Sequence, residues 1–232
     1  WSDVQPTVKD ILEGRFDWSL PDFLYGKLPA GISVIATFSI GHADLGRGLK
    51  PGTWEFQSQQ AENDYINFIK AAVKRYCGGG IHYWQTQNEP AGIMLREEFL
   101  AGNINLDWTG FSHYQEITYK AIKEIDSGAH VAMGGLISGH VLNMPGHPLL
   151  KELPGFFILA LKELRGKYVD IFDIHFYGEG QNWPDNWKDV KFAYDAVRKG
   201  LDSNGFKDTQ IWMTETAIPS FPRRDPRKAR LC

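Results

Sequence analysis

The chain lacks the features that mark several functional classes. Its 232 residues include two cysteines, Cys77 and Cys232, which form no metal-type spacing and do not indicate a disulfide framework. The net charge of −3 provides no basic field for nucleic acid. The longest apolar run, near residues 156–161, is far too short to span a bilayer. We therefore expect neither nucleic acid nor a membrane as a partner.

Motifs for cofactors and metals are also missing. No strand-like segment leads into a G-x-G-x-x-G or phosphate-binding loop, and the 7 histidines show no H-E-x-x-H or comparable spacing. The sequence thus predicts no metal and no cofactor. It leaves the compartment open, secreted or cytoplasmic, because no signal peptide is visible. The chain opens on Trp1 rather than Met, which suggests that it begins inside a longer precursor.

Aromatic residues, by contrast, make up 13% of the chain and include 8 Trp. Tryptophan packs in protein cores, and it also stacks on sugar rings in binding clefts. Both interpretations stay open for these side chains. Trp183 and Trp187, on a loop-like segment after a predicted strand, are candidate sugar platforms or simple lids.

Strand-like and helix-like segments alternate along the chain, with roughly 40 to 50 residues per unit. This alternation predicts an α/β fold with a parallel sheet, and the unit length suits a barrel. We read one domain over residues 1–218 and expect the basic, Pro-rich tail 219–232 to be disordered or an artefact. The predicted strands are 31–40, 81–87, 130–137, 168–177 and 210–214, and the predicted helices are 59–77, 108–126, 149–164 and 186–201.

Two of the predicted strands end in a glutamate. Glu89 follows Asn88 where the strand 81–87 opens into a loop, and Pro90 is expected to hold Glu89 extended. Glu215 follows Thr214, which strict alternation would place on the opposite face of its strand. A solvated turn residue or a structural salt bridge would also explain either glutamate. A pair of such carboxylates at one rim of a sheet is the arrangement that cleaves glycosidic bonds.

A third strand carries polar residues at every second position. Asp173, His175 and Tyr177 share one face, and buried polar groups of this kind need partners. A network with a ligand or with the two carboxylates, or a purely structural network, would satisfy them. Tyr177 is suited to hydrogen-bond a nucleophilic Glu, and His175 to donate to a sugar hydroxyl. His42, after the first strand, is a further candidate for substrate contact.

Together these residues resemble glycoside hydrolase clan A, a superfamily of (β/α)8 barrels. In that clan the acid/base Glu follows an Asn at the end of strand four, and the nucleophile Glu ends strand seven. Asn88-Glu89-Pro90 and Thr214-Glu215 match these motifs with three βα units between their strands, and His175 and Tyr177 match the His-x-Tyr of strand six. The resemblance implies that Glu89 is the acid/base, Glu215 the nucleophile, and Asn88 a ligand of the sugar 2-hydroxyl. It also implies that Tyr177 positions Glu215.

The resemblance covers about residues 16–217, and within it the strand 31–40 would be strand three of the barrel. Strands one, two and eight have no counterpart. The expected fold is therefore a partial (β/α)8 TIM barrel with about five parallel strands. Such a sheet exposes two edges, which predicts a homodimer or an exchange of elements through them.

The predicted function is a retaining glycoside hydrolase that cleaves β-glycosidic bonds of poly- or oligosaccharides by double displacement. Carbohydrate is then the expected partner, while the sugar, the linkage and the activity of the truncated chain stay open. The alternative is a non-catalytic carbohydrate-binding or structural remnant, which the missing strands favour. An aldolase or a metal-dependent hydrolase would need a strand-end Lys or a His/Asp cluster, and the sequence has neither.

Overall fold

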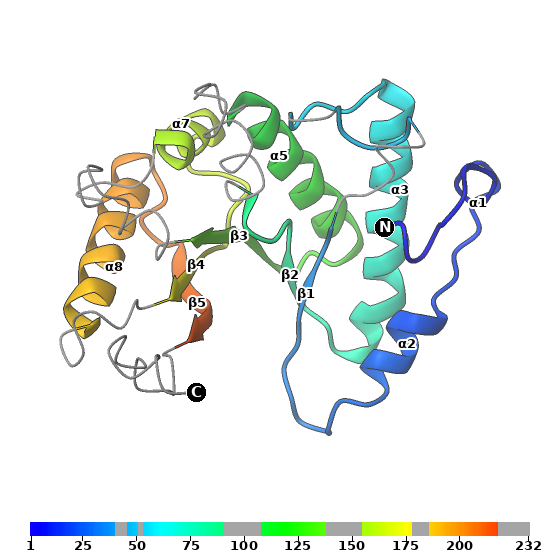
Figure 1. The fold of residues 1–232 in the computed structure, drawn as a ribbon, viewed down its shortest axis with the longest axis horizontal. Helices are drawn as coiled ribbons and strands as arrows, with labels where there is room; N and C mark the ends of the chain where they lie inside the picture. The colour runs from blue at the N-terminus through cyan, green and yellow to red at the C-terminus, as the bar shows by residue number, and fades with distance from the viewer. Residues whose placement is uncertain (40–45, 51–52, 91–107, 138–154, 178–185, 218–232) are drawn as a thin grey trace, which may run out of the picture.

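The computed structural model describes residues 1–39, 46–50, 53–90, 108–137, 155–177 and 186–217 (Figure 1). Within these ranges five parallel strands form one sheet in the order β1-β2-β3-β4-β5. This confirms the predicted α/β half-barrel. The strands are β1 (Ile35–Thr37), β2 (Tyr83–Gln85), β3 (His130–Ile137), β4 (Ile171–Tyr177) and β5 (Gln210–Ala217).

The helices lie in chain order around the outside of the strands, from α3 through α5 and α7 to α8 (Figure 1). The predicted tail 219–232 and the predicted helix start at 149–154 lie outside the described residues. Among the described helices, none combines the length and the apolarity needed to cross a bilayer. The helices are α1 (Val8–Leu12), α2 (Ser19–Tyr25), α3 (Gln59–Tyr76), the 3-10 turn η2 (Cys77–Gly79), α5 (Trp108–Ile125), α7 (Gly155–Leu164) and α8 (Asn186–Ser203).

Helix α3 shows why the sequence predicts these elements well. Its N-cap is Ser58, whose hydroxyl accepts a hydrogen bond from the Ala61 amide at 3.1 Å. A buried stripe then recurs at helical spacing through Tyr65, Phe68 and Ala72. The glycines that follow end the helix, and Gly80 adopts a left-handed φ of 101°.

The core between the helices and the sheet holds the end of β2 in place. Tyr114 of α5 is fully buried and donates a hydrogen bond to the Thr86 carbonyl at 2.6 Å. The Tyr65 hydroxyl of α3 donates to the Tyr114 hydroxyl at 2.6 Å. The Thr86 carbonyl is thus bonded directly to α5 and, through Tyr114, indirectly to α3. Because a buried carbonyl without a partner is unfavourable, this chain of bonds fixes where β2 ends.

The sheet curves, as a barrel wall must. The Gln85 side chain on β2 donates to Asp173 on β4 at 2.6 Å, across the face of β3. The ring centroids of Tyr83 on β2 and Trp212 on β5 lie 5.1 Å apart, although two strands separate them in the sheet. In a flat sheet these side chains could not meet. The concave face is therefore the interior of the half-barrel.

Two irregularities in strand pairing accompany this curvature. In β5, Ile174 pairs with Met213 but His175 pairs with Glu215, so Thr214 is an extra residue in that strand. In β3, the register shifts in the same way between Met133 and Leu136, at a pair of glycines. Extra residues of this kind bend a strand and redirect its side chains.

The outer strands of the described sheet are β1 and β5. The segment that leads into β1 carries large apolar side chains on its surface, including Phe23, whose exposed fraction is 59%. Exposed apolar area of this kind is typical of a contact surface. The surface set consists of Leu12, Leu20, Phe23, Leu24, Leu28 and Ile32. It supports the expectation of self-association, which stays a prediction.

Candidate active site

Glu89 and Glu215 come together at the end of the strands that carry them. One oxygen of each carboxylate and one ring nitrogen of His175 all lie within 4.8 Å of one another. The His175 Nδ1 atom lies 2.8 Å from Glu89 Oε1 and 3.6 Å from Glu215 Oε2. The side chains of Glu89 and Glu215 are 27% and 40% exposed, whereas His175 is fully buried. The carboxylates therefore face solvent, and the imidazole lies behind them.

Asp173 is the buried anchor of this group. Its Oδ2 atom accepts hydrogen bonds from His175 Nε2 at 3.1 Å, Gln85 Nε2 at 2.6 Å and the Thr214 hydroxyl at 2.6 Å. Its Oδ1 atom accepts from the Thr214 amide at 3.1 Å. Four donors from three strands thus converge on one carboxylate. Such convergence stabilises the negative charge of Asp173 in the interior.

His175 carries a positive charge in this setting. Burial lowers the pKa of His175, but hydrogen bonds to Asp173 and Glu89 and the charges of Asp173 and Glu215 outweigh it and raise the pKa to about 9. At neutral pH the ring therefore donates from both nitrogens, Nε2 to Asp173 and Nδ1 to Glu89. An imidazolium placed between carboxylates offsets the repulsion between Glu89 and Glu215.

The backbone at Glu89 corrects the sequence prediction for Pro90. Glu89 has a φ of 44°, in the left-handed region, and is not held extended. A residue with a β-carbon adopts this conformation at a cost of about 1–3 kcal/mol, and the surrounding structure must impose it. Here the hydrogen bond to His175 and the buried ring of Pro90, which follows at once, hold the turn. The strained turn directs the carboxylate toward His175.

The expectation that Thr214 and Glu215 lie on opposite faces was also wrong. The Thr214 hydroxyl lies 3.3 Å from His175 Nε2, while Glu215 lies 3.6 Å from Nδ1 of the same ring. The extra residue in β5 allows two consecutive side chains to reach one histidine. Strict alternation along a strand does not anticipate such a register shift.

Sequence reasoning missed the contribution of Gly134 and Gly135. A β-carbon on Gly134 would lie 1.8 Å from the carbonyl oxygen of Gln87, and one on Gly135 would lie 2.2 Å from His175 Nε2. The first glycine admits the β2 backbone close to β3, and the second admits the imidazole. A Gly-Gly pair inside a strand-like run is the signal that could have identified them. Gln85 and Thr214 were missed as well, since their roles appear only once the strands are paired.

The structure describes the other predicted site residues only in part. Asn88 is exposed beside Glu89, and its carbonyl accepts a hydrogen bond from Gln87 Nε2 at 3.5 Å. Tyr177 ends β4 and Trp187 lies in the first turn of α8, but their side chains are outside the description. His42 and Trp183 lie outside the described residues. The structure therefore groups Glu89, Glu215 and His175 and leaves the remaining assignments as predictions.

The three grouped side chains also approach closely enough to share a metal ion. A metal ion here would displace the proton between His175 Nδ1 and Glu89, because a ligand nitrogen must be free of its proton, and we propose no metal at this place.

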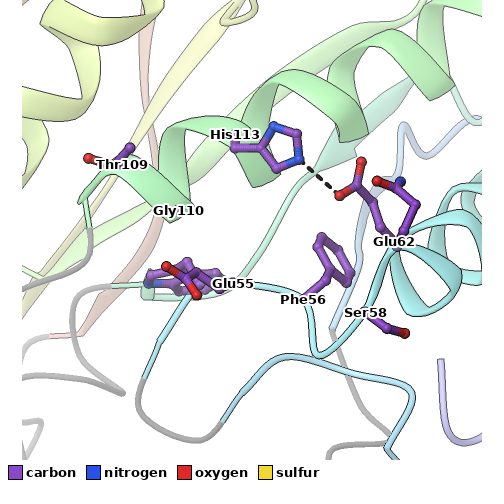
Figure 2. Close-up of a pocket in the computed structure, with 9 residues that line it drawn as sticks. Glu55, Phe56, Ser58, Glu62, Thr109, Gly110 and His113 are labelled. Atoms are coloured by element: carbon purple, nitrogen blue, oxygen red, sulfur yellow. Dashed lines mark hydrogen bonds and ion pairs between the residues drawn. The ribbon is translucent and has the colours of Figure 1, made fainter.

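A separate cavity of about 360 Å³ lies between the segment before α3 and the start of α5. Figure 2 shows its walls, including Phe56, Ser58 and the hydrogen bond in which His113 Nε2 lies 3.1 Å from Glu62 Oε2. Neither Glu89 nor Glu215 lines it. Glu62 and His113 thus form a second carboxylate–histidine pair, which lies outside the barrel interior.

No family model and no curated protein matches the sequence. Solved structures match it at low identity. A glucosidase from Croceicoccus marinus aligns with a TM-score of 0.58 and 17% identity, covering 91% of this chain and 41% of that chain. A monomeric beta-xylosidase from Caulobacter crescentus CB15 aligns with 0.57 and 18%, covering 90% and 42%. A GH family 44 xyloglucanase from Paenibacillus polymyxa aligns with 0.52 and 16%, covering 93% and 58%.

These matches confirm, at the level of fold, the predicted resemblance to the (β/α)8 glycosidases. The chain spans between 41% and 58% of the length of the three structures. What it shares with them is a half-barrel of five parallel strands with its surrounding helices.

Proposed function

We propose that this protein is a retaining β-glycosidase that acts on poly- or oligosaccharides, with Glu89 as acid/base and Glu215 as nucleophile. The observation that carries the proposal is the approach of their carboxylate oxygens to within 4.8 Å. Retaining enzymes hold their two carboxyl groups about 5 to 5.5 Å apart, whereas inverting enzymes leave about 6.5 to 9.5 Å for a water molecule. An approach of single oxygens to within 4.8 Å is compatible with the retaining spacing and supports retention.

The proposed reaction has two steps. Glu215 attacks the anomeric carbon and forms a glycosyl-enzyme ester, while Glu89 gives a proton to the departing glycosidic oxygen. Glu89, now ionised, then takes a proton from a water molecule that attacks the anomeric carbon and releases Glu215. Each step inverts the carbon, so the product keeps the β configuration. Because His175 donates to Glu89 Oε1, the proton that Glu89 transfers in the first step has to be carried by its other oxygen.

Substrate contacts follow from the resemblance and complete the proposal. Asn88, exposed beside the acid/base, is proposed to bind the sugar 2-hydroxyl. Tyr177 is proposed to orient Glu215. The remaining proposed contacts are His42, Trp183 and Trp187, the last two as stacking platforms for sugar rings.

The test is hydrolysis of aryl β-glycosides by the wild-type chain and by Glu215→Ala and Glu89→Ala. With azide added, Glu215→Ala should yield the α-glycosyl azide, because azide attacks the substrate directly from the opposite face. Glu89→Ala should yield the β-glycosyl azide, because azide attacks the glycosyl-enzyme. Loss of the general acid is expected to slow hydrolysis by about 10²- to 10⁴-fold.

Glu62→Gln is the matched control, because Glu62 also pairs with a histidine but lies outside the barrel interior. It should hydrolyse substrate like the wild type. Equal activity of Glu215→Ala and wild type would show that the nucleophile is assigned wrongly.

A second candidate function is carbohydrate binding without hydrolysis. It is favoured by one observation, that the chain spans only 41% of the matched glucosidase. It predicts that an oligosaccharide binds to the chain in calorimetry while no aryl glycoside is cleaved. Binding that is unchanged in Glu215→Ala would place the sugar away from the carboxylates.

A further inference from the structure

Asp173 lies beneath the two carboxylates and does not reach the solvent-facing side of the site. Its side chain is fully buried, and His175 separates it from Glu89 and Glu215. A substrate at the carboxylates would therefore not touch Asp173. Any effect of this residue on the reaction must pass through the imidazole.

The groups around Asp173 are oriented as well as close. The Thr37 hydroxyl on β1 donates to Gln85 Oε1 at 2.7 Å, which turns the other end of that amide, Nε2, toward Asp173. The Thr214 hydroxyl donates to the same Oδ2 atom at 2.6 Å. Every described polar group that reaches this carboxylate is a donor, so the arrangement is built for an anion.

We propose that Asp173 is a positioning residue of this site, which holds the ring of His175 protonated and fixed between Glu89 and Glu215 and so sets the pH range in which the two carboxylates work. The proposal rests on the proposed glycosidase function for its catalytic consequence. Its structural part concerns the charge and orientation of His175 and can be tested without any substrate.

Among the described residues, three carboxylates from different parts of the sheet face His175. Asp173 lies on β4 itself, Glu89 follows β2 and Glu215 lies on β5, at 3.1, 2.8 and 3.6 Å from the ring nitrogens. From β3, the neighbour is Gly135, which carries no charge. Of these groups Asp173 contributes most to raising the pKa of His175, through its hydrogen bond and its charge, against the lowering effect of burial.

Replacing Asp173 with Asn removes the negative charge with little change in the shape of the side chain. The amide oxygen can take the place of Oδ2 and still accept from His175 Nε2, Gln85 Nε2 and the Thr214 hydroxyl. Without the charge beneath the ring, the pKa of His175 falls and the ring becomes neutral at a lower pH than in the wild type. Because the lost positive charge is closer to Glu89 than the lost negative charge of Asp173, ionisation of the catalytic carboxylates becomes less favourable.

The first measurement is the titration of His175 by NMR in wild type and in Asp173→Asn, with Asp64→Asn as control. Asp64 is a buried carboxylate on α3 that pairs with Arg47 at 2.7 Å, away from the site. The pKa of His175 is expected to fall by more than one unit in Asp173→Asn and to stay unchanged in Asp64→Asn. A folded Asp173→Asn protein with an unaltered His175 titration would overturn the proposal.

The second measurement is the pH profile of kcat/KM for hydrolysis of an aryl β-glycoside. Asp173→Asn is expected to move the profile to higher pH by about one unit, since an opposite charge at this distance shifts ionisation by about 1–3 units. A profile that drops in height without moving would indicate a merely structural role and would contradict the proposal. If the wild type has no activity, the glycosidase function fails, while the NMR titration still decides the role of Asp173.

A further variant covers the case in which Asp173→Asn does not fold. The double variant Glu89→Gln/Glu215→Gln removes both charges above the ring and leaves Asp173 alone beneath it. The pKa of His175 should then stay above its ordinary value of 6.5. A fall below that value would show that the carboxylates, and not Asp173, keep the ring protonated.

Discussion

Gly135 lies against the ring of His175, where a β-carbon would come within 2.2 Å of Nε2. We therefore expect Gly135→Ala to displace the imidazole from its position between the carboxylates. Overpacking of this kind destabilises a fold by about 1–3 kcal/mol. The kcat/KM for an aryl glycoside should fall even under conditions in which urea unfolding shows that the variant is fully folded.

The control for this variant is Gly128→Ala. The nearest atom to a β-carbon on Gly128 is a side-chain oxygen of Asp126 at 3.5 Å, an ordinary contact. If Gly135→Ala retains full activity, the ring either has another position available or is not required for the reaction.

Stability should depend on pH through His175. The pKa of its ring is raised to about 9 in the folded chain, against 6.5 as its ordinary value. This contribution is fully present below pH 6.5 and is lost as the pH rises through about 9. Its size is on the order of 2 kcal/mol, allowing for solvent screening near the partly exposed carboxylates. Urea unfolding at pH 6 and pH 9.5 should show this loss in the wild type and not in His175→Gln.

The hydroxyl of Tyr114 is expected to support the end of β2. Tyr114→Phe removes its hydrogen bonds to Tyr65 and to the Thr86 carbonyl, and leaves that buried carbonyl without its donor. The expected loss is about 1–3 kcal/mol in the free energy of unfolding. Tyr119→Phe is the control on the same helix, since its hydroxyl bonds Asp170 at 3.1 Å in a partly buried position. Equal stability of the two variants would contradict the prediction.

Self-association is the fourth prediction. The exposed apolar side chains before β1, together with the outer strands, are expected to produce a concentration-dependent dimer in sedimentation velocity. Phe23→Asp should weaken the dimer. Leu159→Asp, at a 39% exposed position on α7, should not. A monomer at all concentrations would show that these surfaces have no partner in a second copy.

The sequence predicts the elements better than their register. Helix α3 and strand β3 lie within one residue of their predicted bounds, because capping, helical spacing and a bounded apolar run are local signals. Strands β1 and β2 are each three residues long, shorter than their apolar runs, since pairing with a neighbour decides a strand.

The grouping of three side chains could be anticipated from the sequence, while their roles stay predictions. Glu89, Glu215 and His175 are recognisable from their positions at strand ends, and the structure brings them together. The φ of Glu89 and the extra residue Thr214 depend on contacts with other strands, which no local pattern encodes. The role of Asp173 likewise depends on Gln85, which is 88 residues away in the chain.

The bond from Thr37 to Gln85 has a consequence for the outermost strand. An amide can rotate by half a turn at little steric cost, and among the described residues Thr37 and Asp173 together define which end of Gln85 faces inward. Were β1 to fray, water could replace Thr37 and let the amide present its oxygen to Asp173, turning an attraction into a repulsion. Fraying of β1 would then alter the place where sugar is expected to bind, through the rotation of the Gln85 side chain alone.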